Sequence, residues 1–173
     1  SMREALLCHN LASGSGRTMA LMKVTFRELY EVTLETEALA AKLAAIQATD
    51  GEISELQVLH SDLVAAEGNE PLTVDLDARF HTRVADLGRN RVLGLAREPI
   101  ALLLFRGLTQ IAPFVPQFYK RQIEAHSNVV AALRDRDPDR AQKWARRHIQ
   151  DFWRGVQIAG FEDNAAICAK AML

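Results

Sequence analysis

The chain lacks the sequence features of a secreted, membrane-spanning or nucleic-acid-binding protein. Only two of its 173 residues are cysteines, near opposite ends of the chain, which favours a reduced intracellular compartment. Lysine plus arginine total 21 against 22 for aspartate plus glutamate, so the chain has no basic excess for binding nucleic acid. The longest apolar run, residues 100–105, is far shorter than the roughly 18 residues of a membrane span.

Targeting and catalytic patterns are equally scarce. The N-terminus has no ordered basic, apolar and small-residue regions of a signal peptide, so we expect a cytoplasmic protein with no membrane partner. We find no nucleophile paired with a base, no glycine-rich phosphate loop and no paired carboxylates. The sequence therefore does not favour an enzyme.

Helical periodicity is what the sequence does contain. Alternating β-branched segments are missing, and apolar residues recur at helical spacing from Phe26 onward. This pattern predicts an all-α fold, an antiparallel bundle of six or seven helices. The expected helices cover residues 26 to about 50, 52–67, 73–88, 90–111, 117–134 and 138–159, and the tail 163–173 is a candidate for the seventh. The first helix is predicted to bury Leu29, Val32, Leu39, Leu43 and Ile46.

Asp77 and His81 are the first candidates for a functional site. They lie four residues apart in a predicted helix capped by Thr73, so both side chains occupy one helix face. A lone histidine on such a face is usually a hydrogen-bonded core residue. The pair therefore indicates a binding site only if further ligands lie nearby. His60 has no partner at such a spacing and is expected at the surface.

Two further histidines flank a predicted helical hairpin. Asp137 is a suitable N-cap and Pro138 suits the first helical position, so one helix ends near Arg136 and the next begins at Pro138. His126 lies ten residues before Arg136, and His148 lies ten residues after Pro138. In an antiparallel hairpin both rings reach the same height, roughly 15 Å from the turn, and can face each other.

One carboxylate and three imidazoles form the ligand set of a divalent metal ion. These donors suit zinc, nickel, manganese or iron, and geometry alone does not choose among them. We expect zinc. The alternative is a bundle used only for dimerisation, with its histidines buried and metal-free. Spacing alone does not decide whether the two pairs of residues meet.

Other polar residues are candidates for binding a small molecule. Arg106 interrupts the most apolar helix, where it would either anchor an anionic group through bidentate hydrogen bonds or face solvent. Gln110 follows one turn later, and Asn128 and Tyr119 are further candidates. Glu124 could act as a base toward a metal-bound water, which keeps a metal-dependent hydrolase or lyase as the alternative function, although a solvated helix residue is the simpler interpretation.

Three segments resemble a known family, in the right order along the chain. Residues 77–81 (Asp-Ala-Arg-Phe-His) and 88–90 (Gly-Arg-Asn) resemble the D-x-x-F-H and G-N segment of the FCD domain. Residues 124–133 resemble its E-H-x-x-hydrophobic segment, and residues 136–149 resemble its closing D-P-x-x-A and R-x-H-hydrophobic segment. The FCD domain is the C-terminal effector-binding domain of FadR-subfamily GntR transcription regulators, and the resemblance covers about residues 29–152.

The resemblance implies a function and an organisation. Asp77, His81, His126 and His148 would hold the metal of an effector pocket in residues 23–173, and the effector would be a small, carboxylate-bearing metabolite. The intact regulator would be a homodimer that binds operator DNA through winged-helix domains, which are not recognisable in residues 1–22, a remnant or linker. The chain departs from the family at Thr33, where an arginine that commonly faces the pocket usually stands.

Overall fold

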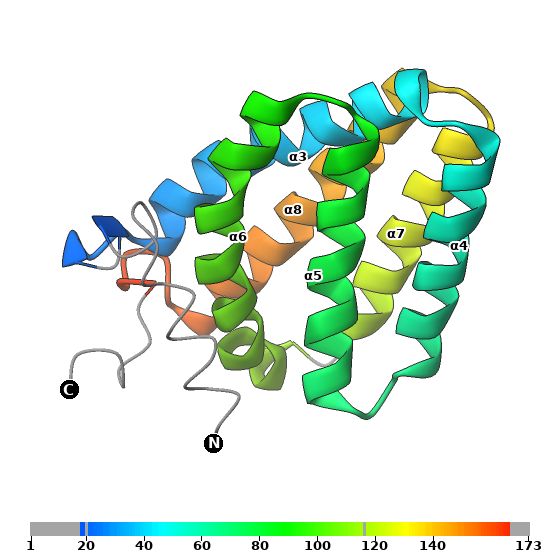
Figure 1. Cartoon of the computed structure of the whole chain (residues 1–173). Coiled ribbons are helices and arrows are strands. Elements are labelled where there is room, and N and C mark those ends of the chain that lie inside the picture. Colours follow the sequence, from blue (N-terminus) through cyan, green and yellow to red (C-terminus); the bar gives the residue numbers. More distant parts are fainter. Residues whose placement is uncertain (1–17, 20, 116, 167–173) are drawn as a thin grey trace.

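The computed structural model describes residues 18–19, 21–115 and 117–166, without the side chains of residues 102 and 105–110. Within these residues the chain forms α-helices and one short 3-10 helix, and the all-α prediction is confirmed (Figure 1). The elements are α3 (Phe26–Gln47), α4 (Asp50–Ala65), α5 (Glu70–Leu87), α6 (Arg91–Ile111), η1 (Ala112–Phe114), α7 (Phe118–Arg134) and α8 (Pro138–Ala159). In the described part, extended pairing is limited to one isolated bridge between Thr25 and Ala165.

Helix α3 packs against more helices than α4 does. It contacts α5, α6, α7 and α8, while α4 packs against α5 and α7 at the other side (Figure 1). One cluster of buried apolar residues lies in the middle of the bundle, with contributions from α3, α4, α5, α6, α7 and α8. Elements far apart in the sequence therefore present side chains to one interior space.

The buried face of α3 matches the predicted one only in part: Leu29 is buried and Leu43 is half-buried against the core. Val32, Leu39 and Ile46 are 47%, 40% and 56% exposed. The helix instead buries a face of small residues, comprising Ala38, Ala40, Ala41, Ala44 and Ala45. Four helices pack around α3, and small side chains allow this close approach. The same face also buries Thr33 and Glu37, two polar residues that become important for the site.

Helix ends follow local capping chemistry. The side chains of Thr25 and Thr49 each accept a hydrogen bond from the backbone N–H of the glutamate three residues ahead. In both cases this contact forms part of a capping box. Asp137 caps α8 as expected. The predicted Thr73 cap of α5 is wrong, because the cap is Asn69, four residues earlier, and the helix has a proline in its first turn.

The C-terminal tail differs from the predicted seventh helix where the structure describes it. Residues 163–166 form a turn and the bridge to Thr25 rather than a helix, and the rest of the predicted seventh helix lies outside the described residues.

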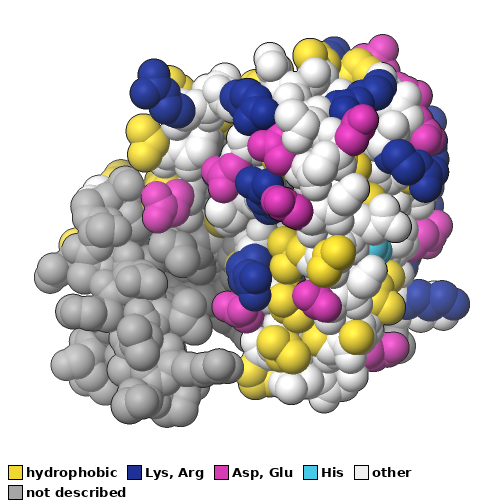
Figure 2. All heavy atoms as spheres, turned by 45° about the vertical axis from the view of Figure 1, so that its right-hand side comes forward, with side chains coloured by type: hydrophobic (Ala, Val, Ile, Leu, Met, Phe, Trp, Pro, Cys, Tyr) yellow, Lys and Arg dark blue, Asp and Glu magenta, His cyan; other side chains and the backbone are white. Residues whose placement is uncertain are grey.

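Figure 2 shows acidic and basic side chains interspersed on one face, with hydrophobic side chains gathered in its lower half. No helix in the described ranges has both the length and the apolar character needed to cross a membrane.

The close packing of α8 makes a prediction for Gly155. A Cβ added there would lie 2.8 Å from Cγ2 of Ile111, so Gly155→Ala should destabilise the fold by about 1–3 kcal/mol through overpacking. Gly94 is the matched control, since its Cβ would meet nothing within 4 Å and alanine favours a helix. Urea unfolding measures both variants. Equal stability of the two variants would contradict the expected contact.

Candidate metal centre

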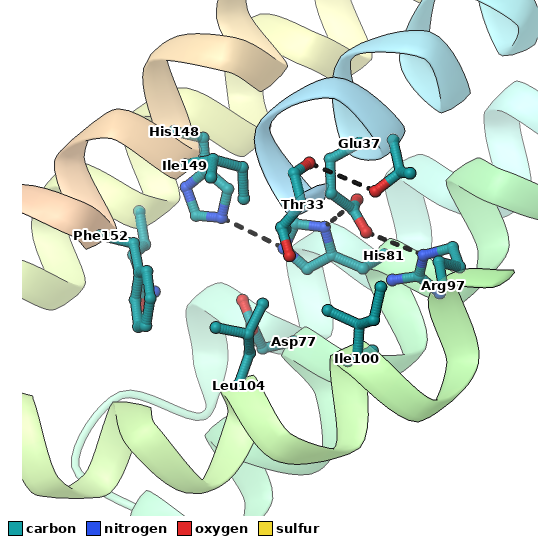
Figure 3. Close-up of a pocket in the computed structure, with 13 residues that line it drawn as sticks. Thr33, Glu37, Asp77, His81, Arg97, Ile100, Leu104, His148, Ile149 and Phe152 are labelled. Atoms are coloured by element: carbon teal, nitrogen blue, oxygen red, sulfur yellow. Dashed lines mark hydrogen bonds and ion pairs between the residues drawn. The ribbon is translucent and has the colours of Figure 1, made fainter. Parts of the chain in front are cut away.

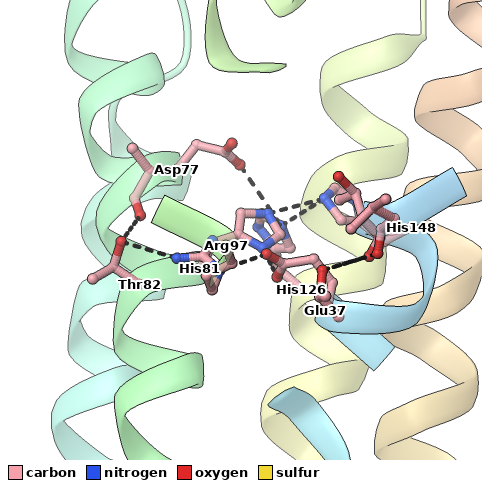
Figure 4. A network of polar contacts seen from close by, with 11 residues as sticks. Glu37, Asp77, His81, Thr82, Arg97, His126 and His148 are labelled. Carbon is pink, nitrogen blue, oxygen red and sulfur yellow. Dashed lines mark hydrogen bonds and ion pairs between the residues drawn. The ribbon is translucent and has the colours of Figure 1, made fainter. Parts of the chain in front are cut away.

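Three buried histidines from three helices converge at the centre of the bundle (Figure 4). His81 lies on α5, His126 on α7 and His148 on α8. Their Nε2 atoms form a nearly equilateral triangle, with sides of 3.1 Å (His81–His148), 3.3 Å (His81–His126) and 3.3 Å (His126–His148). The hairpin thus brings together the two rings that its spacing suggested, and α5 adds the third.

This triangle has the dimensions of one face of a metal coordination sphere. With metal–nitrogen distances of about 2.1 Å, its sides correspond to N–metal–N angles of roughly 95–105°, between octahedral and tetrahedral values. Protons alone satisfy the arrangement poorly, because one N–H cannot serve three converging nitrogens. The donor set therefore fits a divalent cation, with positions left for other ligands.

The ring environments favour the metal-binding form of two of these histidines. Burial, followed by the charge of His148, lowers the pKa of His126 well below its usual value. Burial, followed by the charge of His81, lowers the pKa of His148 to about 3. Both are consequently neutral imidazoles, the form that binds a metal. Phe80 stacks on the His126 ring at 4.2 Å between centroids and restricts its orientation.

Asp77 lies beside the triangle rather than within it. Its Oδ1 atom is 3.7 Å from Nε2 of His126, and only the three histidines have ligand atoms all within 4.8 Å of one another among the described residues. Burial raises the pKa of Asp77 to about 6, although the charge of His81 opposes this shift. A nearby cation would hold the carboxylate in its charged form.

A buried network that the sequence did not suggest orients His81. Nδ1 of His81 lies 2.9 Å from Oε2 of Glu37, and Nε of Arg97 donates to Oε1 of the same carboxylate at 2.8 Å. Burial alone would raise the pKa of Glu37, but His81 and Arg97 outweigh it and lower this pKa to about 2. A carboxylate on Nδ1 fixes the tautomer that directs Nε2 toward a metal. The same carboxylate raises the pKa of His81 against the effect of burial, so it favours positive charge at this site.

A small cavity adjoins the histidines (Figure 3). Asp77, His81 and His148 line it, and α3, α6, α7 and α8 supply the other walls. Inside this cavity, the centre of a water molecule can occupy about 40 Å³ of space. The apolar part of its lining consists of Ile100, Ala101, Leu104, Ile149 and Phe152. The arrangement can hold a small molecule against a metal ion.

Of the other predicted binding residues, two lie outside the cavity and two have side chains that the structure does not describe. The hydroxyl of Tyr119 donates to the Leu63 carbonyl at 2.6 Å, and Asn128 donates to the Glu124 carbonyl at 2.8 Å. Neither side chain lines the cavity. Arg106 and Gln110 belong to α6, but their side chains lie outside the described part of the structure.

His60 is a correction to the sequence analysis. It is buried rather than at the surface, with 9% of the residue exposed, and Nε2 lies 2.8 Å from Oγ of Ser127. Its ring is 6.2 Å from that of His126 between centroids, yet it is not part of the metal-type cluster. Spacing could not detect it, because its partner lies 67 residues away.

Comparisons with known proteins agree with this architecture. The FCD domain model matches residues 28–151. A solved structure described as Streptococcus agalactiae GntR is similar in fold, with a TM-score of 0.63 and 24% identity over 74% of this chain. The chain spans 57% of the length of that structure. A comparison with curated proteins finds no significant match. The family match covers most of the bundle and shows that the chain belongs to the FCD domain family.

Proposed function

We propose that this chain is the metal-dependent effector-sensing domain of a DNA-binding transcription regulator. The observation that carries the proposal is the triangle of three Nε2 atoms beside a cavity. Zinc is our choice of ion, held by His81, His126 and His148. Asp77, 3.7 Å from His126, would complete the set after a small side-chain rotation.

The bound ion would attract an anionic effector into the adjoining cavity. A divalent ion supplies positive charge and open coordination positions, both of which suit a carboxylate. Arg106 and Gln110 stay candidates for further contacts with the effector, whereas Tyr119 and Asn128 would have to leave their present hydrogen bonds. A ligand alters the regulator only through a difference in affinity between two arrangements of the bundle.

DNA binding belongs to the intact regulator in this proposal. A homodimer would place two winged-helix domains on an operator in the cytoplasm, and the effector would change how they hold it. The alternative of a metal-dependent hydrolase or lyase depended on Glu124. That side chain is exposed and does not line the cavity, so no observation favours the alternative.

A thermal-shift screen of small carboxylic acids tests the sensor function. At a ligand concentration of 100 times Kd, binding to the folded state adds about 2.7 kcal/mol, or roughly 5–11 °C in Tm for a chain of this size. We expect such a shift for zinc-loaded protein and its loss after treatment with a chelator. A ligand that shifts the stripped and loaded proteins equally would contradict the role of the metal.

A further inference from the structure

Three large apolar side chains of α3 lie uncovered at the surface. Val32, Leu39 and Ile46 are 47%, 40% and 56% exposed. They recur every seven residues, so they occupy one side of the helix over a length of about 21 Å. Single exposed apolar residues are normal, but a row of them along one helix indicates a contact surface. We call these three residues the α3 stripe.

The residues between the members of the stripe complete the pattern of a helix-pairing surface. Thr36 and Leu43 are half-buried and lie at alternating spacings of four and three residues from their neighbours in the stripe. An apolar repeat that averages 3.5 residues is the pattern of helices that pack along each other. Because α3 buries a different face, of small residues, within the bundle, the partner for this repeat has to come from outside the described chain.

The α3 stripe is complementary to itself when two copies run antiparallel. Leu39 lies at its midpoint, seven residues from each of the other two members. A twofold axis through Leu39 places this side chain against its own copy and places Val32 against Ile46. One surface thus meets an identical surface, which is the contact that a closed dimer requires.

Charges beside the stripe favour the antiparallel direction. Glu35 and Lys42 lie along one edge of it, four residues before and three residues after Leu39. An antiparallel pair brings Glu35 of each copy toward Lys42 of the other, whereas a parallel pair would bring like charges together. Both side chains are accessible, 64% and 37% exposed, although each also has an ion-pair partner on α8. These partners, Arg146 and Asp139, have opposite signs, so the same pairing brings them toward each other as well.

We propose that a second copy of this chain covers the α3 stripe in an antiparallel, twofold-symmetric helix pair. This inference rests on the homodimer in the proposed function and adds the surface through which the dimer forms. Helix α3 also carries Glu37, whose carboxylate lies 2.9 Å from His81. A single helix therefore joins the dimer contact to the metal centre.

Sedimentation velocity over a range of protein concentrations tests the contact. We expect a monomer–dimer equilibrium for the wild type. In Leu39→Glu the dissociation constant should rise by about 100-fold or more, because two carboxylates would then meet at the axis inside an apolar contact. Leu39 is 40% exposed, so this variant should fold normally, which urea unfolding checks.

Leu95→Glu is the matched control. This leucine is 73% exposed but lies on α6, so the variant should dimerise as tightly as the wild type. An unchanged dissociation constant in Leu39→Glu, or equal weakening in both variants, would overturn the inference.

Cysteine cross-linking tests the direction of the pair. Val32→Cys and Ile46→Cys are made separately in a chain whose two native cysteines are replaced by serine. Under mild oxidation, a mixture of the two variants should form disulfide-linked heterodimers, because the antiparallel pair brings the two positions together. Each variant alone should form few cross-links. Efficient cross-linking of either variant with itself would indicate a parallel pair and overturn the inference.

The remaining outcome separates this inference from the sensor function. A wild-type chain that stays monomeric up to about 100 μM would overturn the inference, and another occupant would then have to cover the stripe. The thermal shift with carboxylic acids does not depend on this contact, so it would still decide the sensor function.

Discussion

Replacing His126 and His148 together by alanine is expected to abolish stoichiometric zinc uptake. These two imidazoles supply two of the three Nε2 atoms in the triangle, and both are neutral and ready to coordinate. Loss of a mere supporting hydrogen bond typically lowers metal affinity by about 10–100-fold, so loss of two ligands should lower it far more. Titration against a chromophoric chelator measures the affinity.

His60→Ala is the control for that result. It also removes a buried imidazole close to His126, but one whose Nε2 is engaged by Ser127. We expect this variant and the wild type each to take up one zinc ion per chain. Stoichiometric zinc in the double variant, or its loss in His60→Ala alone, would refute the assignment of the ligands.

Glu37→Ala should be the most destabilising single substitution near the site. It leaves the guanidinium of Arg97, a residue only 4% exposed, without its carboxylate partner, and it removes the carboxylate beside Nδ1 of His81. Removing one partner of a buried ion pair costs about 3–5 kcal/mol. Guanidinium chloride unfolding of metal-free protein measures this loss separately from any effect on metal binding.

Glu35→Ala is a matched control on the same helix. Glu35 forms two short contacts with Arg146, at 2.6 and 2.7 Å, but its side chain is 64% exposed. Solvent screens such pairs, so we expect little change in unfolding free energy. If the two variants lose equal stability, burial is not what makes the Glu37–Arg97 pair important.

The sequence was informative wherever local spacing determines geometry. Four-residue spacing placed Asp77 and His81 on one helix face, and the hairpin turn placed His126 opposite His148. Glu37 and Arg97 escaped notice because their meaning depends on partners 44 and 60 residues away. One signal was available: Glu37 shares helical spacing with Ala41 and Ala44, so an acid occupies an otherwise small and buried face.

The predicted buried face of α3 was right for Leu29 but wrong for three other residues, for a related reason. Periodicity identified large apolar residues as the core-facing side, as it does for a helix at the surface of a bundle. A helix that contacts four others instead buries its alanines where the helices approach closely, and Val32 and Ile46 are left exposed. Which residues are buried therefore depended on the position of the helix in the bundle, which a single sequence does not state.

The separation of the three histidines along the chain has a consequence for how the fold is held together. They are 45 residues (His81 to His126) and 22 residues (His126 to His148) apart. An ion bound to all three would close two long loops at once, much as a pair of disulfide cross-links would. The bound ion would thereby act as a reversible cross-link within the bundle. Its formation would depend on the supply of a cation rather than on the redox state of the surroundings.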